Sequence, residues 1–310
     1  MLSFARELEA LREAGEVDPQ RASFLLRIER LELMSVHYEI RLAAWLSVAA
    51  IATAVGAILR KNLDRIGPLA VAFVIAAAAG ALYAWAFVRK RRGTAGVLDD
   101  YLAFLAALLV SADTGYVEQQ FDLLGPHGFD HLAILAVVHA AFAYALRSKL
   151  ILSLALAALA GWFGVDRTAA AMFDTSAEIG IRALLCAGFV VIWFLLHRRL
   201  TPFRGLDATF EHFAANLFGI GAVALAADDV HQWSGLALVV IFAAAAGTLA
   251  VRRRSELFLL YALAYGIAGV SSAVARHLKE EVLLTLYSLA VFAGAIVALF
   301  VAHLRWRFDE

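Results

Sequence analysis

Side chains that could bind a cation or a proton lie within or beside the long apolar runs of this chain. Asp113 and Glu118 lie near the end of one run, His139 lies inside the next, and Asp228 and Asp229 end a later one. Ionisable groups are costly inside apolar segments, so we predict these five as ligand or ion candidates. The alternative is that the carboxylates only end helices and that His139 makes a hydrogen bond between helices.

A second group of residues has spacing that is reminiscent of a metal site. His127, Asp130 and His131 form an HxxDH cluster, and two histidines four residues apart can share a metal on one helix face. Pro126 and Gly128 interrupt a regular helix through this pair. We therefore predict a solvated loop and no metal, with these three residues as the candidates if a metal were bound.

Two basic clusters could bind anionic lipid headgroups. We predict as headgroup candidates Arg89, Lys90, Arg91, Arg92, Arg252, Arg253 and Arg254. The alternative is that these residues only set the orientation of the chain in a membrane.

Signatures of soluble enzymes and of cofactor binding are missing. The chain has no GxSxG, HExxH, GxxxxGK[ST] or GxGxxG motif, so no catalytic residue and no cofactor are predicted. Cys186 is its single cysteine, which excludes an intramolecular disulfide and a CxxC site. The formal charge of zero gives no basic field for nucleic acid.

The composition indicates that these residues lie in or beside membrane-spanning helices. The chain is 63% hydrophobic and 17% charged, with a mean hydropathy of +0.77, well outside the range of soluble domains. Apolar runs long enough to cross a bilayer as helices recur from Leu42 onward. We predict an all-α bundle with spans at 42–59, 66–88, 101–117, 131–146, 149–165, 179–196, 213–227, 234–251, 257–275 and 282–303.

Basic residues in the loops predict the orientation of this bundle. With the N-terminus inside, the inner loops contain both basic clusters together with Arg147, Lys149, Arg198, Arg199 and Arg204. The outer loops contain fewer basic residues, although Arg60, Lys61 and Arg65 are an exception. The positive-inside rule therefore places both termini in the cytoplasm.

The chain has two predicted parts, a head at residues 1–41 and a transmembrane bundle at 42–310. The head reads as two amphipathic helices, with Gly15 ending the first and Asp18-Pro19 beginning the second. We predict a cytoplasmic helical hairpin that packs on itself, on the membrane or on a protein partner.

The sequence predicts an internal duplication of the bundle. Trp85 and Val97-Leu98-Asp99 recur as Trp193 and Gly205-Leu206-Asp207, with a basic run between them in both places. LILSLALAAL at 150–159 matches LFLLYALAYG at 257–266. We predict a parallel repeat of four spans at about 66–165 and 179–275, flanked by spans 42–59 and 282–303. The alternative is that Ala- and Leu-rich helices resemble each other by composition alone.

Two stretches resemble a known group of bacterial proteins. They are the turn Ala14-Gly15-Glu16-Val17-Asp18-Pro19 and the run from Asp99 through an acidic loop to Arg147-Ser148-Lys149. The chain resembles, over its head and about its first five spans, an uncharacterised predicted membrane protein family defined by a domain of unknown function. The resemblance implies a bacterial inner-membrane location and supplies no catalytic residues.

These observations leave several functions open. The leading hypothesis is a permease-like transporter that moves a small solute, an ion or a lipid along the interface between the repeats. The alternative is a non-enzymatic scaffold, sensor or accessory subunit that binds a protein partner through residues 1–41. A lipid-modifying membrane enzyme would need a convergent His/Asp cluster that the sequence does not show. The lipid bilayer is the one predicted partner that all readings share, and the oligomeric state stays open.

Overall fold

The computed structural model describes residues 18, 42–43, 45–51, 53–54, 57, 67–94, 96–125, 130–165, 177–201, 203–277 and 281–308. The chain divides into two compact units, Met1–Gly67 and Pro68–Glu310. The predicted head at 1–41 lies outside the described residues, except for Asp18. The described positions of the predicted span at 42–59 are helical.

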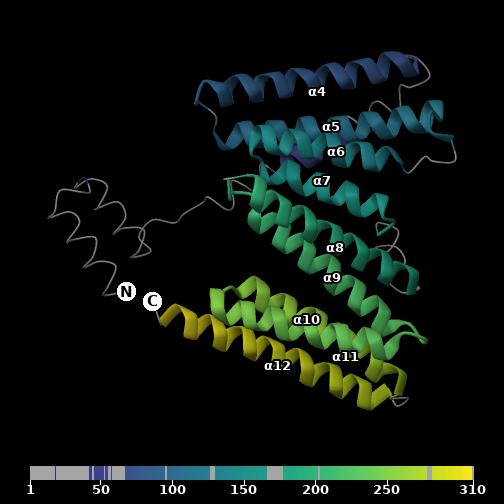
Figure 1. Ribbon diagram of the computed structural model, residues 1–310, viewed down its shortest axis with the longest axis vertical. Helices are drawn as coiled ribbons and strands as arrows, with labels where there is room; N and C mark the ends of the chain where they lie inside the picture. Colours follow the sequence, from purple (N-terminus) through teal and green to yellow (C-terminus); the bar gives the residue numbers. More distant parts are fainter. Residues whose placement is uncertain are drawn as a thin grey trace. The chain divides into compact units, whose positions relative to one another are not determined.

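The second unit is helical in every regular element that the structure describes (Figure 1). Its helices begin and end within a few residues of the predicted spans. They are α4 Pro68–Arg91, α5 Val97–Phe121, α6 Asp130–Leu146, α7 Lys149–Trp162, α8 Ala177–Leu200, α9 Asp207–Ala227, α10 Gln232–Arg253, α11 Glu256–His277 and α12 Glu281–Phe308.

Six of these helices are long and apolar enough to cross a membrane: α4, α5, α8, α9, α10 and α11. The helices α6 and α7 and the Leu289–Leu304 part of α12 are shorter apolar helices. The prediction of a multi-span all-α membrane protein is therefore confirmed. The count of ten spans stays a prediction.

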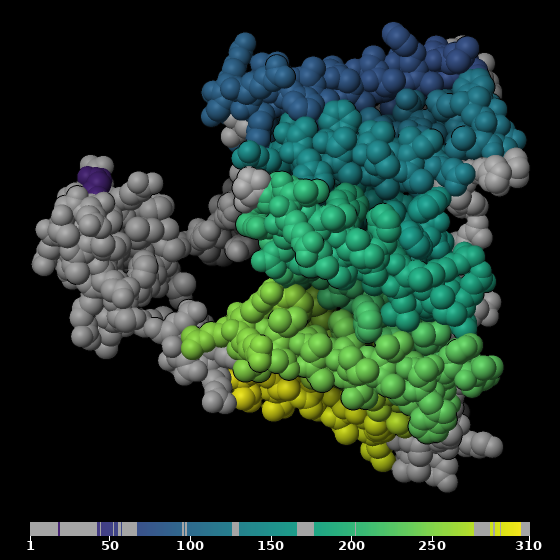
Figure 2. Space-filling model, viewed as in Figure 1, coloured from purple at the N-terminus to yellow at the C-terminus, as the bar shows by residue number. Residues whose placement is uncertain are grey.

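Neighbours in sequence pack as helical hairpins within this unit. The helix α4 packs on α5, α6 on α7, α8 on α9 and α10 on α11. The helix α9 also packs on α10 and α11, while α7 contacts α5, α8 and α9. Figure 2 shows that the colours of α4 to α12 follow one another in successive bands. A shared apolar core, which includes Leu152, Leu156, Val190 and Phe210, joins α7 to α8 and α9.

Small residues let the helix backbones approach closely, as expected where packing drives association in lipid. A Cβ atom on Gly180 of α8 would lie 3.0 Å from the carbonyl oxygen of Gly221 on α9, and the reverse distance is 2.9 Å. A Cβ atom on Gly235 of α10 would lie 2.0 Å from the backbone nitrogen of Ala226 on α9. Glycine is thus required at these crossings.

The two shortest connections have the same backbone geometry. Arg147, between α6 and α7, has φ +52°, and Arg254, between α10 and α11, has φ +48°. The next residues, Ser148 and Ser255, each donate a backbone N–H to the carbonyl of an alanine five residues earlier, at 3.0 Å. These left-handed residues end one helix and reverse the chain at once.

The ends of the helices define two faces of the unit. Lys90 Nζ of α4 donates to the carbonyl oxygen of Leu146 on α6 at 2.8 Å, and Tyr144 of α6 contacts His197 of α8. Arg253 of α10 pairs with Glu211 near the start of α9. These helix ends lie on the same side of the unit. We call this side the basic end, because both basic clusters lie here, and we call the other side the opposite end.

Candidate functional site

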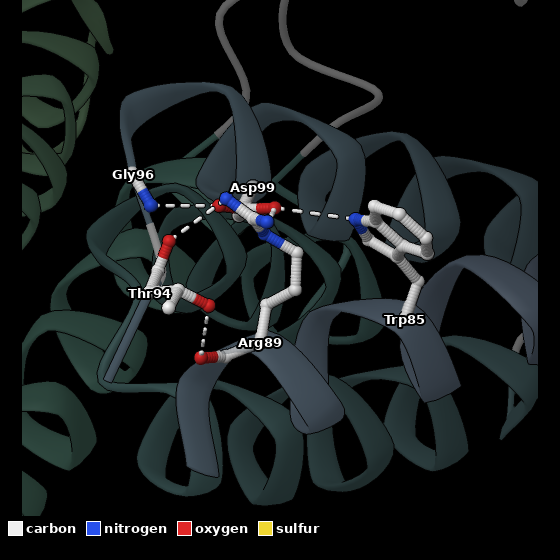
Figure 3. A network of polar contacts seen from close by, with 5 residues as sticks. All are labelled: Trp85, Arg89, Thr94, Gly96 and Asp99. Carbon is white, nitrogen blue, oxygen red and sulfur yellow. Dashed lines mark hydrogen bonds and ion pairs between the residues drawn. The ribbon is translucent and has the colours of Figure 1, made fainter. Parts of the chain in front are cut away.

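The most extensive polar network in the described bundle lies at the basic end, where α4 leads into α5 (Figure 3). Asp99, in the first turn of α5, is only 7% exposed. Its Oδ1 accepts the indole N–H of Trp85 at 3.2 Å, and its Oδ2 accepts the backbone N–H of Gly96 at 2.7 Å. Arg89 Nε lies 2.8 Å from Oδ1, as an ion pair.

Helix chemistry explains this position for a carboxylate. The first backbone N–H groups of a helix have no partner within the helix, and its N-terminus favours negative charge. Asp99 reaches back to Gly96 in the manner of a capping box. The Nη2 group of Arg89 donates to the carbonyl oxygen of Thr94 at 2.8 Å. The network therefore joins α4, α5 and the loop between them, and the Asp99 carboxylate has a structural role.

The α8–α9 connection has a tryptophan and an aspartate at the same spacing, but its contacts differ. Asp207 Oδ1 has no hydrogen-bond partner among the described residues, and the Trp193 ring contacts Phe210. Trp193 and Asp207 follow Trp85 and Asp99 by 108 residues each, and His197 follows Arg89 by the same interval. His197 Nε2 lies 3.3 Å from Asp207 Oδ1, and Arg198 Nε lies 3.7 Å from Asp207 Oδ2. An imidazole therefore occupies the position that a guanidinium occupies in the α4–α5 hairpin.

His139 lies inside α6 and is fully buried. Its Nε2 is 2.7 Å from Ser111 Oγ of α5, which is an interhelical hydrogen bond. Its Nδ1 has no hydrogen-bond partner within the described part of the chain. His139 thus makes the interhelical hydrogen bond that the alternative interpretation expected, and its Nδ1 is left without a partner among the described residues.

The predicted carboxylates of α5 do not meet His139 in a common cluster. Asp113 is half-buried, and its Oδ1 lacks a hydrogen-bond partner among the described residues. Glu118 accepts the backbone N–H of Leu124 with both oxygens, at 3.2 and 3.3 Å. Glu118 therefore organises the chain after α5, and its role as an ion ligand stays a prediction.

Asp228 and Asp229 follow the last residue of α9. Asp228 Oδ1 lies 2.7 Å from His231 Nδ1 and accepts the backbone N–H groups of His231 and Val230 at 2.9 and 3.0 Å. The His231 side chain is the main cause that holds the pKa of the Asp228 carboxyl below its usual range. Asp228 therefore has a helix-ending role, and Asp229 is exposed beside it.

The residues of the possible metal cluster are only partly covered by the structure. Asp130 begins α6 and accepts the indole N–H of Trp162 at 3.1 Å, and His131 is half-buried behind it. His127 lies outside the described residues. Across the described ranges, no group of three or more His, Cys, Asp or Glu side chains is arranged to hold a metal ion.

Several basic residues that were predicted to bind lipid headgroups also have partners within the bundle. Arg89 joins the Asp99 network, Lys90 caps the end of α6, and Arg253 Nη1 lies 2.5 Å from Glu211 Oε2. Arg254 has the left-handed conformation that ends α10. Arg91, Arg92 and Arg252 are exposed at the basic end. A role in headgroup binding stays a prediction for the whole set.

An apolar groove of about 510 Å³ lies between α6, α7 and α8. Its lining includes Ala136 from α6, Trp162 from α7 and Phe189 from α8, and no charged side chain contributes to it. We call it the seam groove. Sequence reasoning did not find it, because a groove depends on how three helices cross. The Asp99 network was likewise missed as a contact, although the spacing of its residues was the signal for the repeat.

The family resemblance expected from the sequence is confirmed. Residues 9–152 match the family described as "Predicted membrane protein (DUF2157)". No curated protein and no solved structure gives a significant match.

Proposed function

We propose that this predicted membrane protein is a permease-like carrier that moves an amphiphilic solute along the seam between two copies of a four-helix unit. The copies are α4–α7 and α8–α11. Many membrane carriers contain such repeats and place their substrate site where the repeats meet.

Matched local structures support the duplication. Both copies begin with a hairpin whose connection places a basic or imidazole side chain near an aspartate. Both contain a second hairpin closed by a left-handed arginine and a serine. The Arg89–Asp99 and His197–Asp207 contacts lie 108 residues apart and the two turns lie 107 apart, which supports duplication over chance similarity of Ala- and Leu-rich helices.

The seam groove carries the proposal, because it lies where the first copy meets the second. Its walls come from α6 and α7 on one side and α8 on the other. An ion or a small polar solute would need polar groups along its path, since unpaired polar atoms are costly in an apolar environment. The lining is apolar. Of the three candidates, a small solute, an ion and a lipid, the lipid therefore fits the groove best.

The basic end is proposed to face the cytoplasm of a bacterial cell, with the protein in the inner membrane. The basic loops at 89–92, 147–149, 198–204 and 252–254 lie at this one end, as the positive-inside rule expects for cytoplasmic loops.

Transport can be tested with purified protein in liposomes that contain a fluorescent phospholipid in both leaflets. Membrane-impermeant dithionite quenches the outer leaflet only, so a carrier increases the quenched fraction beyond about half. Ala140 borders the groove and is half-buried, whereas its neighbour Ala141 is exposed and lies outside the lining. We expect Ala140→Phe to slow the lipid movement at least several-fold and Ala141→Phe to leave it unchanged. Quenching equal to that of protein-free liposomes would refute the carrier.

A second function, that of a scaffold or accessory subunit, is favoured by the division of the chain. Met1–Gly67 is one of the two compact units, and it contains the predicted head at 1–41 together with the predicted span at 42–59. Removal of residues 1–41 should then abolish co-purification of a partner and leave the bundle folded. If the truncated protein retains the same partners, the scaffold proposal fails.

A further inference from the structure

We infer that the seam groove binds one acyl chain of an anionic membrane lipid, with the headgroup at the basic end beside Arg147, Arg198 and Arg199. The inference rests on the seam site of the proposed carrier and adds the chemical class of its ligand. It requires binding only, so it can hold even if no transport occurs.

The shape of the groove fits an extended chain. On α6 the lining residues are Ala133, Ala136, Val137 and Ala140, which lie on one face of the helix. Seven residues of α-helix rise about 10 Å, so this face forms a straight strip of that length. Three of its four residues are alanines, which leave space above the helix backbone.

The opposite wall has the same spacing and larger side chains. On α8 the lining residues are Phe189, Ile192, Trp193 and Leu196. Val137 and Ile192 are 71% and 60% exposed, so the groove opens sideways along its length. In a membrane this opening faces lipid tails, which can enter without crossing a polar surface.

The groove is bounded at the basic end by an aromatic contact between its two walls. The rings of Tyr144 on α6 and His197 on α8 have centroids 5.4 Å apart. Tyr144 follows Ala140 by one helical turn, and His197 directly follows Leu196. The headgroup end of an acyl chain that lies in the groove is therefore at this contact, next to the loops of the basic end.

Those loops have the charge that selects an anion. The guanidinium of Arg147 lies 5.0 Å from the Phe203 ring, which brings the α6–α7 turn to the α8–α9 loop. Arg198 and Arg199 end α8 and are exposed. Asp207 offsets part of this charge through Arg198. Basic pockets between membrane helices are suited to anionic headgroups.

The opposite end of the groove lacks this excess of positive charge among the described residues, because Arg182 there is paired with Glu178. Trp162, which lines the groove, donates its indole N–H to Asp130. A carboxylate here repels an anionic headgroup, so the asymmetry of charge sets the direction of the lipid. This asymmetry also distinguishes a lipid from an uncharged partner helix, which would gain nothing from the basic rim.

The full-length protein in nanodiscs provides the test. Each nanodisc preparation contains trace phosphatidylglycerol or phosphatidylcholine with a photoactivatable diazirine in one acyl chain. Mass spectrometry then locates the labelled peptides. We expect labelling of α6 and α8 at the groove, at least threefold stronger with phosphatidylglycerol. Ala140→Phe should remove this labelling, whereas Ala141→Phe should retain it.

The headgroup contact is tested by variants at the basic rim. Arg147→Asn suits the left-handed backbone at this position, and Arg199→Gln changes an exposed side chain. Each should reduce the preference for phosphatidylglycerol, and together they should abolish it, while Arg182→Gln near the start of α8 leaves it unchanged. Equal labelling by both lipids in the unaltered protein, or labelling unaffected by Ala140→Phe, would overturn the inference. Groove labelling without lipid movement would refute the carrier and support the lipid site. Lipid movement without groove labelling would support a carrier and refute the lipid site.

Discussion

Replacing Asp99 by alanine tests how much the polar network at the start of α5 contributes to stability. The carboxylate accepts two N–H groups, from Trp85 and Gly96, and pairs with Arg89. The substitution removes these contacts together and leaves two donors and one cation without their partner. The matched control is Asp100→Ala, one residue later in the same helical turn.

The expected loss follows from the contacts that disappear. A hydrogen bond to a charged group contributes roughly 1.5–3 kcal/mol, so two such bonds set an upper range of about 3–6 kcal/mol. Water reaches Trp85 and Arg89, which are about half and one-third exposed, and recovers part of this. We expect the free energy of unfolding to fall by about 2–4 kcal/mol, against less than about 1 kcal/mol for the control.

The chain contains its own probe for this measurement. Cys186 is the single cysteine and is fully buried in α8, so a maleimide dye reacts with it only when the bundle opens. Thermal unfolding in detergent followed by this reaction gives an apparent midpoint for each variant. A loss of this size lowers the midpoint by roughly 4–16 °C in a domain of this size.

The result is decisive in either direction. Equal midpoints for Asp99→Ala and Asp100→Ala would show that the network contributes no net stability. The corresponding change in the second copy, Asp207→Ala, should cost only about 1 kcal/mol or less, because its nearest partners lie at 3.3 and 3.7 Å.

The same assay tests three further expectations. Gly235→Ala should lower the midpoint strongly or prevent folding, because its Cβ would overlap the backbone of α9, whereas Gly247→Ala meets no atom within 4 Å and should be neutral or stabilising by up to about 1 kcal/mol. The pKa of Asp228 is lowered in the folded state by its hydrogen bond to His231, so its contribution is present at neutral pH and disappears as the pH falls through that lowered value; Asp228→Asn should therefore lower the midpoint at pH 7 and make no difference in strong acid. Ser111→Ala removes the partner of the buried imidazole on α6 and should cost about 0.6–2 kcal/mol, measured at neutral pH.

The sequence predicted the helices well, because hydropathy reports directly on what a bilayer accepts. The largest difference at a helix start concerns α9, which begins at Asp207, six residues before the predicted apolar span at 213–227. Glu211 and His212 lie between this helix start and the apolar span. In the structure Glu211 pairs with Arg253, and the ring of His212 stacks on Phe258 with centroids 5.4 Å apart. Partners on other helices thus permit polar residues inside a helix, and a single sequence does not show those partners.

The candidate site was less predictable for a related reason. His139 and Asp113 were conspicuous as single polar residues in apolar runs, yet the structure gives them separate surroundings. The seam groove is lined by alanines and large apolar residues that look like ordinary span residues in sequence. Only the crossing of α6, α7 and α8 makes them a recess.

The lengths of α6 and α7 have a consequence for the bilayer itself. At 17 and 14 residues these helices rise about 26 and 21 Å, less than the hydrocarbon thickness of about 30 Å. Such hydrophobic mismatch is relieved when the surrounding leaflets become locally thinner. The thinning would occur beside the helices that line the seam groove, where it shortens the distance that a headgroup must travel through hydrocarbon.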